Sequence, residues 1–315
     1  MTRLILSIFS ALIVFSSPAV AADKPVVYVP VLPYEWLFER VGGDWIDVKA
    51  IVGEGDDAHD YSPTPKQLTR IAGANLVFSG NLGFEGNFFV KLGDGKDAPK
   101  EIDLLEGLDL LEGSCSICET EHEAGGEHSE KEHEEEEHEE EHDHEHHDHD
   151  HGDLKDPHVW LSPKMLIQQA TRVGSILKEF TPKEAAPEID ANVAKLTEEL
   201  TALDQEIAAT LEPIKGQVFY VYHGAFSYFA QSYGLVQKAV EVTGRRPSPK
   251  QLASIAEHAK KDGVKVIFVQ PQFDQSAAAS LAETIGGSVK ELDPLEKDVI
   301  ANLKAITATL QEIRE

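Results

Sequence analysis

The sequence predicts an α/β protein of two similar lobes, each a mostly parallel sheet flanked by helices, joined by one long helix. The first observation is a repeat: Thr64–Gly80 and Ser248–Gln270 share the run Pro-Lys-Gln-Leu-x-x-Ile-Ala, followed in each case by an apolar, β-prone segment. The second is that predicted strands and helices alternate along the chain, which is typical of parallel sheets. The third is an amphipathic helical pattern between the two halves.

Each copy of the repeat opens with the signals of a helix N-terminus. Thr64 and Ser248 are predicted N-caps, and a proline follows each at the first helical position. Gln67 and Gln251 stand three residues after the caps, as a capping box requires. Capped helices can resemble one another by coincidence, but the shared helix-then-strand context favours two lobes of similar construction.

The remaining elements follow the same alternation. Strands are expected at Val26–Val29, Ile46–Ile51, Leu76–Ser79, Gln217–Tyr222, Val266–Val269 and Ser288–Leu292. Helices are expected near Glu35–Val41, Pro163–Glu179, Ala225–Tyr233, Ser276–Thr284 and Asp298–Arg314. Between the halves, apolar residues recur at spacings of three and four, at Leu196, Leu200, Leu203, Ile207 and Leu211. This spacing predicts a long helix that joins the lobes stiffly.

The chain is expected to begin with a cleavable export signal over residues 1–21. Arg3 precedes the apolar run Leu4–Phe15, and Ala19-Val20-Ala21 is a small-residue cleavage site. The run is shorter than the ~20 residues that span a bilayer, so export to a bacterial periplasm is favoured over a membrane anchor. Residues 22–181 are then the first lobe, 182–212 the connecting helix and 213–315 the second lobe.

Residues 113–153 are predicted to be a disordered insertion in the first lobe, because they combine dense like charge with almost no apolar residues. Within them, residues 121–151 hold sixteen acids and one lysine, which accounts for −15 of the net charge of −28. The rest of the negative charge is dispersed and no basic cluster exists, which argues against a nucleic-acid partner.

Four of the fourteen histidines lie in sequence that can fold. His258 is inside the helix of the second repeat and is expected at the surface. His59 and His223 follow predicted strands, His158 precedes a predicted helix, and Asp293 follows the last strand. In open α/β sheets, ligands bind beyond the carboxyl ends of the strands, where such loops converge. Three imidazoles and one carboxylate would form a tetrahedral set for Zn²⁺, although each histidine taken singly is more often a hydrogen-bonded loop residue.

Five segments resemble the metal-binding receptors of ABC importers for zinc and manganese, the periplasmic solute-binding family called cluster A-I. In chain order they are "DAHDYSPTPKQL", "DPHVWLSP", "YHGAFSYFAQSYGL", "VIFVQPQF" and "LDPL", and "DPHVWLSP" is the most specific. The resemblance extends from about Val26 to the end of the chain. It implies two α/β lobes that hold one metal ion in the cleft between them, with His59, His158, His223 and Asp293 as ligands.

The resemblance also implies that the metal is zinc. Manganese receptors tend to have Glu where this chain has His223, and imidazole suits Zn²⁺ while oxygen-rich sites suit Mn²⁺. Some zinc receptors carry a Glu immediately before the first histidine, where this chain has Ala58. Asp293 or a water is therefore left as the fourth ligand.

The acidic tract is expected to be a second, weaker zinc-binding element. Acidic linkers need no histidine to stay soluble, whereas this tract supplies many interchangeable ligands. A disordered chain loses entropy when it wraps a metal, so its affinity should be low. The tract histidines are His122, His128, His133, His138, His142, His144, His146, His147, His149 and His151.

The cysteines are Cys115 and Cys118, at the edge of the tract. Some zinc receptors have a disulfide in the second lobe, which this chain cannot form. For the pair it does have, a local disulfide and a thiolate pair that binds metal both stay open. A C-x-x-C redox enzyme is disfavoured, because this pair stands at the start of a predicted disordered region and not at the start of a helix.

These inferences lead to a monomeric zinc receptor that feeds an inner-membrane ABC permease and its ATPase, with a periplasmic metallochaperone as a further candidate partner. Such a receptor catalyses nothing, since four protein ligands close the coordination sphere that a hydrolase keeps open. The alternatives are a manganese receptor, a periplasmic zinc hydrolase with Asp293 as general base, and a zinc-buffering protein in which the tract is the main actor.

Overall fold

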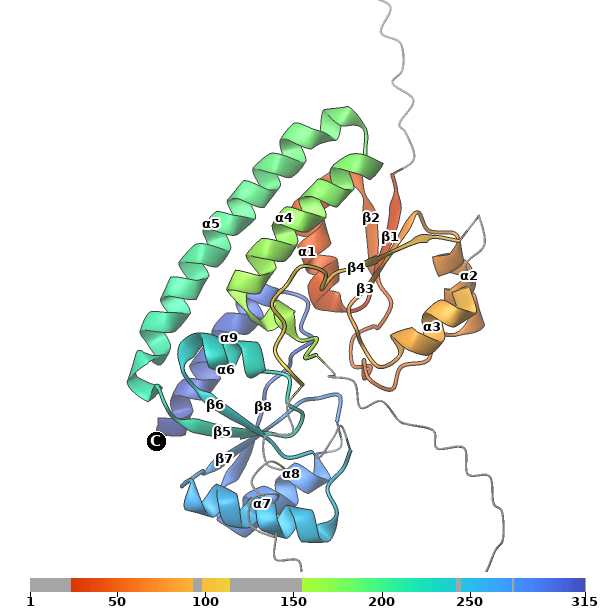
Figure 1. Cartoon of the computed structure of the whole chain (residues 1–315). Helices are drawn as coiled ribbons and strands as arrows, with labels where there is room; N and C mark the ends of the chain where they lie inside the picture. Colours follow the sequence, from red (N-terminus) through yellow and green to blue (C-terminus); the bar gives the residue numbers. More distant parts are fainter. Residues whose placement is uncertain (1–23, 93–97, 114–154, 242–244, 274, 315) are drawn as a thin grey trace, which may run out of the picture.

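The computed structural model describes residues 24–92, 98–113, 155–241, 245–273 and 275–314 (Figure 1). The predicted export signal, the acidic tract with its ten histidines, and the cysteine pair lie outside these ranges. Within them, no helix combines the length and the apolar character needed to cross a membrane.

The first lobe contains a four-stranded parallel sheet. Its strands are β1 (Val26–Val29), β2 (Asp47–Ala50), β3 (Leu76–Ser79) and β4 (Lys100–Asp103), in the order β2-β1-β3-β4. The helices between the strands are α1 (Leu32–Gly42), α2 (Pro65–Ala72) and α3 (Glu85–Leu92). The central strand β3 is fully buried, as expected of a parallel strand covered on both faces.

The second lobe repeats this arrangement. Strands β5 (Val218–Val221), β6 (Val236–Ala239), β7 (Val266–Val269) and β8 (Ser288–Glu291) form a parallel sheet in the order β6-β5-β7-β8. Its helices are α6 (Ser227–Tyr233), α7 (Pro249–Lys261), α8 (Ser276–Ile285) and α9 (Val299–Gln311). The equivalent strand orders confirm the prediction of two similar α/β lobes.

The repeated helices begin as the sequence predicts. In α2 the amide of Gln67 donates to Thr64 Oγ1 at 3.3 Å, and the amide of Thr64 donates to Gln67 Oε1 at 2.9 Å. In α7 the Ser248–Gln251 pair makes the same two bonds at 3.4 and 2.9 Å. Both capping boxes are therefore present.

Two long helices run side by side, α4 (Pro163–Phe180) and α5 (Ala186–Leu211), and the longer α5 extends along both lobes (Figure 1). The apolar residues that predicted the connecting helix are all buried in α5. Helix α5 packs on α4 and α1 at one end and on α9 at the other. Close packing is possible because Gly174 faces α5, where a Cβ atom would come within 2.7 Å of Val193 Cγ2.

Among the strands and α-helices of the described residues, β4, β6 and α3 were not predicted. Strands β4 and β6 are edge strands with charged or polar residues, so they lack the continuous apolar run that marks a central strand. Helix α3 is only eight residues long, too short to show a clear helical period. Helix α1 starts at Leu32, three residues before the prediction, because Pro33 fits its first turn.

Candidate metal centre

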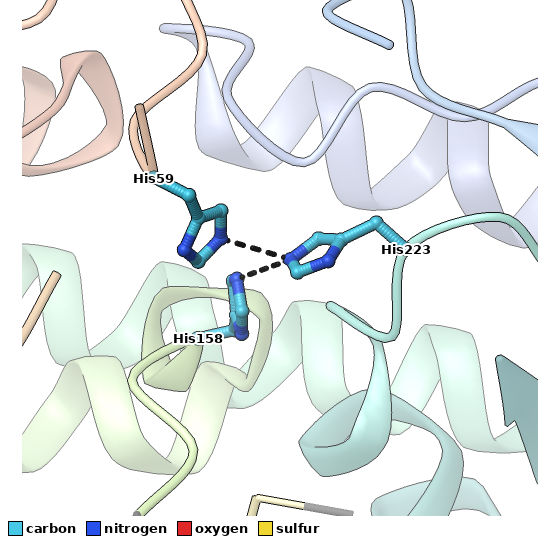
Figure 2. Close-up of side chains that lie close together, drawn as sticks. All are labelled: His59, His158 and His223. Atoms are coloured by element: carbon cyan, nitrogen blue, oxygen red, sulfur yellow. Dashed lines mark hydrogen bonds between the residues drawn. The ribbon is translucent and has the colours of Figure 1, made fainter. Parts of the chain in front are cut away.

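Three imidazoles from distant parts of the chain meet at one point (Figure 2). His59 lies in the loop between β2 and α2, His158 precedes a short 3-10 turn (Val159–Leu161), and His223 lies two residues after the end of β5. The Nε2 atom of His223 is 3.0 Å from that of His59 and 3.2 Å from that of His158. The structure therefore brings together the three histidines that the sequence predicted.

These distances suit a small tetrahedral cation. Ligand nitrogens at 2.0–2.1 Å from Zn²⁺ in tetrahedral geometry are about 3.3 Å apart. The observed separations of 3.0 and 3.2 Å are close to this value. Within the described ranges, these are the His, Cys, Asp and Glu side chains that gather in a group able to hold a metal ion.

His59 is positioned by its loop. Its amide donates to Asp57 Oδ1 at 2.8 Å. Its carbonyl oxygen packs against Gly83, where an added Cβ atom would lie only 2.8 Å from that oxygen. Glu85 fixes the turn that contains Gly83, since its carboxylate accepts hydrogen bonds from the amides of Gly80 and Leu82 at 2.9–3.0 Å. The close approach at residue 83 therefore requires glycine.

His158 is buried, and Asp156 holds its ring. Asp156 Oδ1 accepts hydrogen bonds from the His158 amide at 2.9 Å and from its Nδ1 at 2.7 Å. Burial by itself would raise the pKa of Asp156, but the His158 imidazole and amide outweigh it and lower the pKa below the usual value. On its other side the His158 ring contacts Trp160 edge to face, at 5.2 Å between centroids.

His223 is fixed through both its backbone and its ring. Gln270, fully buried at the end of β7, accepts from the His223 amide at 3.1 Å and donates to its carbonyl oxygen at 2.7 Å. The ring stacks on Phe273 with an interplanar angle of 23°. Its Nδ1 lies 2.5 Å from Glu241 Oε1, a carboxylate that is itself buried.

The two carboxylates determine how the rings present their nitrogens. Asp156 and Glu241 accept hydrogen bonds when ionised, so they favour the tautomer with the proton on Nδ1. The Nε2 lone pairs of His158 and His223 are then directed toward the meeting point. This carboxylate–histidine arrangement is the one that orients imidazole ligands in metal sites.

The ring of His59 favours the neutral form. Desolvation of the ring, and then the nearby imidazoles of His223 and His158, lower its pKa to about 3, although the residue as a whole is exposed. A neutral imidazole is the form that binds a metal. The local environment therefore favours a cation other than a proton at this point.

Asp293 lies near the site but is not grouped with the imidazoles. Its Oδ1 accepts bonds from Gln272 Nε2 and from the Leu295 amide, both at 2.8 Å. Gln272 and Leu295 line the cavity beside the three rings. The assignment of Asp293 as a metal ligand stays a prediction. His258 is in α7 and is not part of this group. It was expected at the surface, but it is half-buried and its Nδ1 is shielded from solvent, because α7 packs on the second lobe along this side.

Sequence reasoning missed the residues that orient the rings. Asp156 was visible in the "DPH" block, and its position two residues before a candidate ligand is a usable signal. Glu241 and Gln270 gave no such signal, because each reaches His223 only through the order of strands in the second sheet.

The chain is similar to known zinc-binding proteins over most of its length. Residues 27–315 match the model of a family described as the periplasmic component A of a zinc-uptake complex. A protein of Chlamydia muridarum is 27% identical over 315 residues, which cover 99% of this chain and 100% of that protein. The zinc-binding lipoprotein AdcA of Streptococcus pneumoniae is 29% identical over 298 residues, which cover 93% of this chain and 54% of AdcA. The chain thus spans about half the length of AdcA.

Solved structures show the same fold. A crystal structure of ZnuA is 29% identical, with a TM-score of 0.76 and coverage of 93% of this chain and 100% of that one. A ZnuA deletion mutant with zinc bound has the same identity of 29% and TM-score of 0.76, and covers 92% of this chain and 98% of its own.

Proposed function

The chain belongs to the family of periplasmic zinc-uptake components, and from this premise we propose that it binds one Zn²⁺ between its lobes for delivery to an ABC importer. Members of this family are solute-binding receptors of ABC importers and not enzymes, so the zinc ion is cargo. The hydrolase alternative is thereby set aside.

The convergence of three Nε2 atoms supports the proposal most directly. His59 comes from the first lobe, His223 from the second, and His158 from the segment that leads into α4. A cation bound to all three would link the two lobes. Zinc binding would then favour one arrangement of the lobes, which a permease can distinguish from the unliganded form.

The ligand types favour zinc over manganese. All three grouped donors are imidazole nitrogens, and two are oriented by carboxylates through Nδ1. Imidazole suits Zn²⁺, whereas Mn²⁺ prefers oxygen ligands. A manganese receptor remains the alternative within the family, and a direct competition between the two metals decides it.

Asp293 is our proposal for the fourth ligand, with water as its alternative. Its Oδ1 accepts both of the side chain's hydrogen bonds, so Oδ2 makes none to the described residues. Because Asp293 is not grouped with the imidazoles, its side chain would have to move to bring this oxygen to the metal. The Gln272 and Leu295 contacts would then orient the carboxylate.

The remaining parts of the proposal concern the cell. We propose that a signal over residues 1–21 exports the protein to the periplasm, that it acts there as a monomer, and that it docks on an inner-membrane permease coupled to an ATPase. A metallochaperone is a candidate donor. The acidic, histidine-rich tract would be an auxiliary chelator of lower affinity.

A zinc titration of two forms tests the proposal. The mature protein should bind several Zn²⁺, one tightly, while a form without Glu119–Gly152 should keep one tight site and its folding. Mn²⁺ should not displace that ion at equal concentration. A truncated form without tight zinc binding would assign the metal to the tract, which is the buffering alternative.

A further inference from the structure

A segment of the second lobe reaches across to the first lobe beside the metal centre. Residues 293–298 connect β8 to α9, and we call them the bridging segment. Its residues Pro294 and Leu295 line the cavity that holds the three imidazoles. The segment thus forms part of the wall of this cavity.

A buried hydrogen bond fixes one point of the bridging segment. Trp160 Nε1 donates to the carbonyl oxygen of Pro294 at 2.7 Å, and Trp160 is 1% exposed. The same indole packs edge to face on His158 and on Tyr34 of α1. The position of Pro294 is therefore tied to a ligand ring and to a first-lobe helix.

A charged contact fixes a second point. Lys297 Nζ lies 2.6 Å from Glu35 Oε1 and 2.8 Å from Glu39 Oε1, and both acids are on α1. The Glu35 side chain is 18% exposed, so this ion pair is partly shielded from solvent. Glu35 also accepts from the amide of Ala50 at 2.5 Å, at the end of the strand that leads into the His59 loop.

Hydrogen bonds also fix both ends of the bridging segment. Asn302 Nδ2 of α9 donates to the carbonyl oxygen of Asp293 at 2.7 Å, and Asp298 caps α9 through the Ala301 amide. The segment is therefore held at both ends, at Pro294 and at Lys297.

We propose that Lys297 is a latch residue: its ion pairs with Glu35 and Glu39 hold the bridging segment across the two lobes and slow the release of bound zinc. The inference rests on the proposed zinc site. Lys297 contacts no metal ligand and acts by positioning. Before the lobes can part at this point, both ion pairs and the Trp160 bond must break.

Zinc release into excess chelator, followed by stopped flow on the form without Glu119–Gly152, tests the latch. Lys297→Met should release zinc about three- to tenfold faster, as expected for the loss of two partly exposed ion pairs. Lys297→Arg should stay near the wild-type rate, and Glu39→Gln should fall between the two.

Lys304→Met is the matched control. Lys304 is on α9, pairs with Glu206 of α5 at 2.9 Å, and is half exposed, but it touches neither the bridging segment nor the cavity. It should release zinc at the wild-type rate, while the zinc-free melting temperatures of the two methionine variants should agree.

The outcomes separate the latch from the site it serves. A wild-type release rate in Lys297→Met, or equal acceleration in both methionine variants, overturns the latch. Absence of tight zinc in the parent protein overturns the proposed function instead.

Discussion

At the residue scale, the metal centre depends on residues that hold the three histidines in place without lying among the grouped ligand atoms. Each imidazole is restrained behind its Nε2 atom: His158 by Asp156, His223 by Glu241, and His59 by its loop backbone. Neutral nitrogens 3.0–3.2 Å apart repel one another unless a proton or a cation lies between them. The restraint therefore keeps the three nitrogens close together, and a cation bound between them would relieve their repulsion.

The three histidines should be the main source of affinity. His59→Ala, His158→Ala and His223→Ala should each weaken tight zinc binding by more than about 100-fold, since even changes to groups behind the ligands cost 10–100-fold. Asp293→Ala should cost less, because water can replace it. His258→Ala serves as the control and should bind zinc normally. Competition titration measures all five, and a series in which His258 alone mattered would refute the ligand assignment.

Asp156 and Glu241, the carboxylates that contact the Nδ1 atoms of His158 and His223, should contribute measurably to zinc affinity. Asp156→Asn and Glu241→Gln should each lower zinc affinity by roughly 10–100-fold while the zinc stoichiometry stays at one. Asp262→Asn is a suitable control, because Asp262 pairs with Lys238 and Tyr220 away from the site. Equal affinities for all three variants would mean that the rings need no support from carboxylates.

The lowered pKa of His59 predicts an unusual response to acid. Three independent imidazoles with a pKa near 6.5 would release three protons per zinc below that pH. Because desolvation of the ring and the two neighbouring imidazoles lower the His59 pKa to about 3, at most two should be released. In the form without the tract, the slope of log affinity against pH between 5 and 6 should therefore be two or less. A slope near three would contradict the neutral state of His59.

The same pKa has a consequence for the zinc-free protein. The folded value is below the unfolded value, so neutral His59 contributes stability that is fully present above about pH 6.5. This contribution is lost progressively as the pH falls toward 3. Denaturant unfolding of wild type and His59→Ala at pH 7 and pH 5 should show a smaller loss of stability on acidification in the variant.

At the element scale, the site depends on how closely loops can approach one another. The His59 loop packs on the turn before α3, and this contact is possible only because residue 83 has no side chain. The turn is itself fixed by Glu85, whose pKa burial raises to about 7 against the opposing hydrogen bonds from backbone amides. The position of His59 is thus set by an element that the sequence did not reveal.

A pair of alanine substitutions tests this contact. Gly83→Ala should displace the His59 loop, cost about 1–3 kcal/mol of stability and weaken zinc binding roughly tenfold. Gly86→Ala is the matched control three residues away, because its Cβ atom would meet nothing within 4 Å. It should leave zinc affinity unchanged and stability equal or slightly higher. Calorimetric titration and thermal melts measure zinc affinity and stability in both variants. Equal affinities would contradict the claim that the contact at Gly83 positions His59.

At the scale of the whole molecule, the parts that the sequence predicted well are those with local signals. The capping boxes at Thr64 and Ser248, the buried strands β3 and β7 and the amphipathic face of α5 all follow from short-range patterns. The edge strands β4 and β6 do not, because their exposed polar residues resemble loops. The ligand set was predicted from motifs, whereas Glu241 and Lys297 depend on contacts between segments far apart in the chain.

The central claim is that one zinc ion bound by three imidazoles joins the two lobes. Anomalous diffraction at the zinc edge, from zinc-loaded crystals of the form without Glu119–Gly152, tests it most directly. One strong peak should lie about 2.0–2.1 Å from the Nε2 atoms of His59, His158 and His223. A peak elsewhere, or one bound by histidines from a single lobe, would contradict the claim.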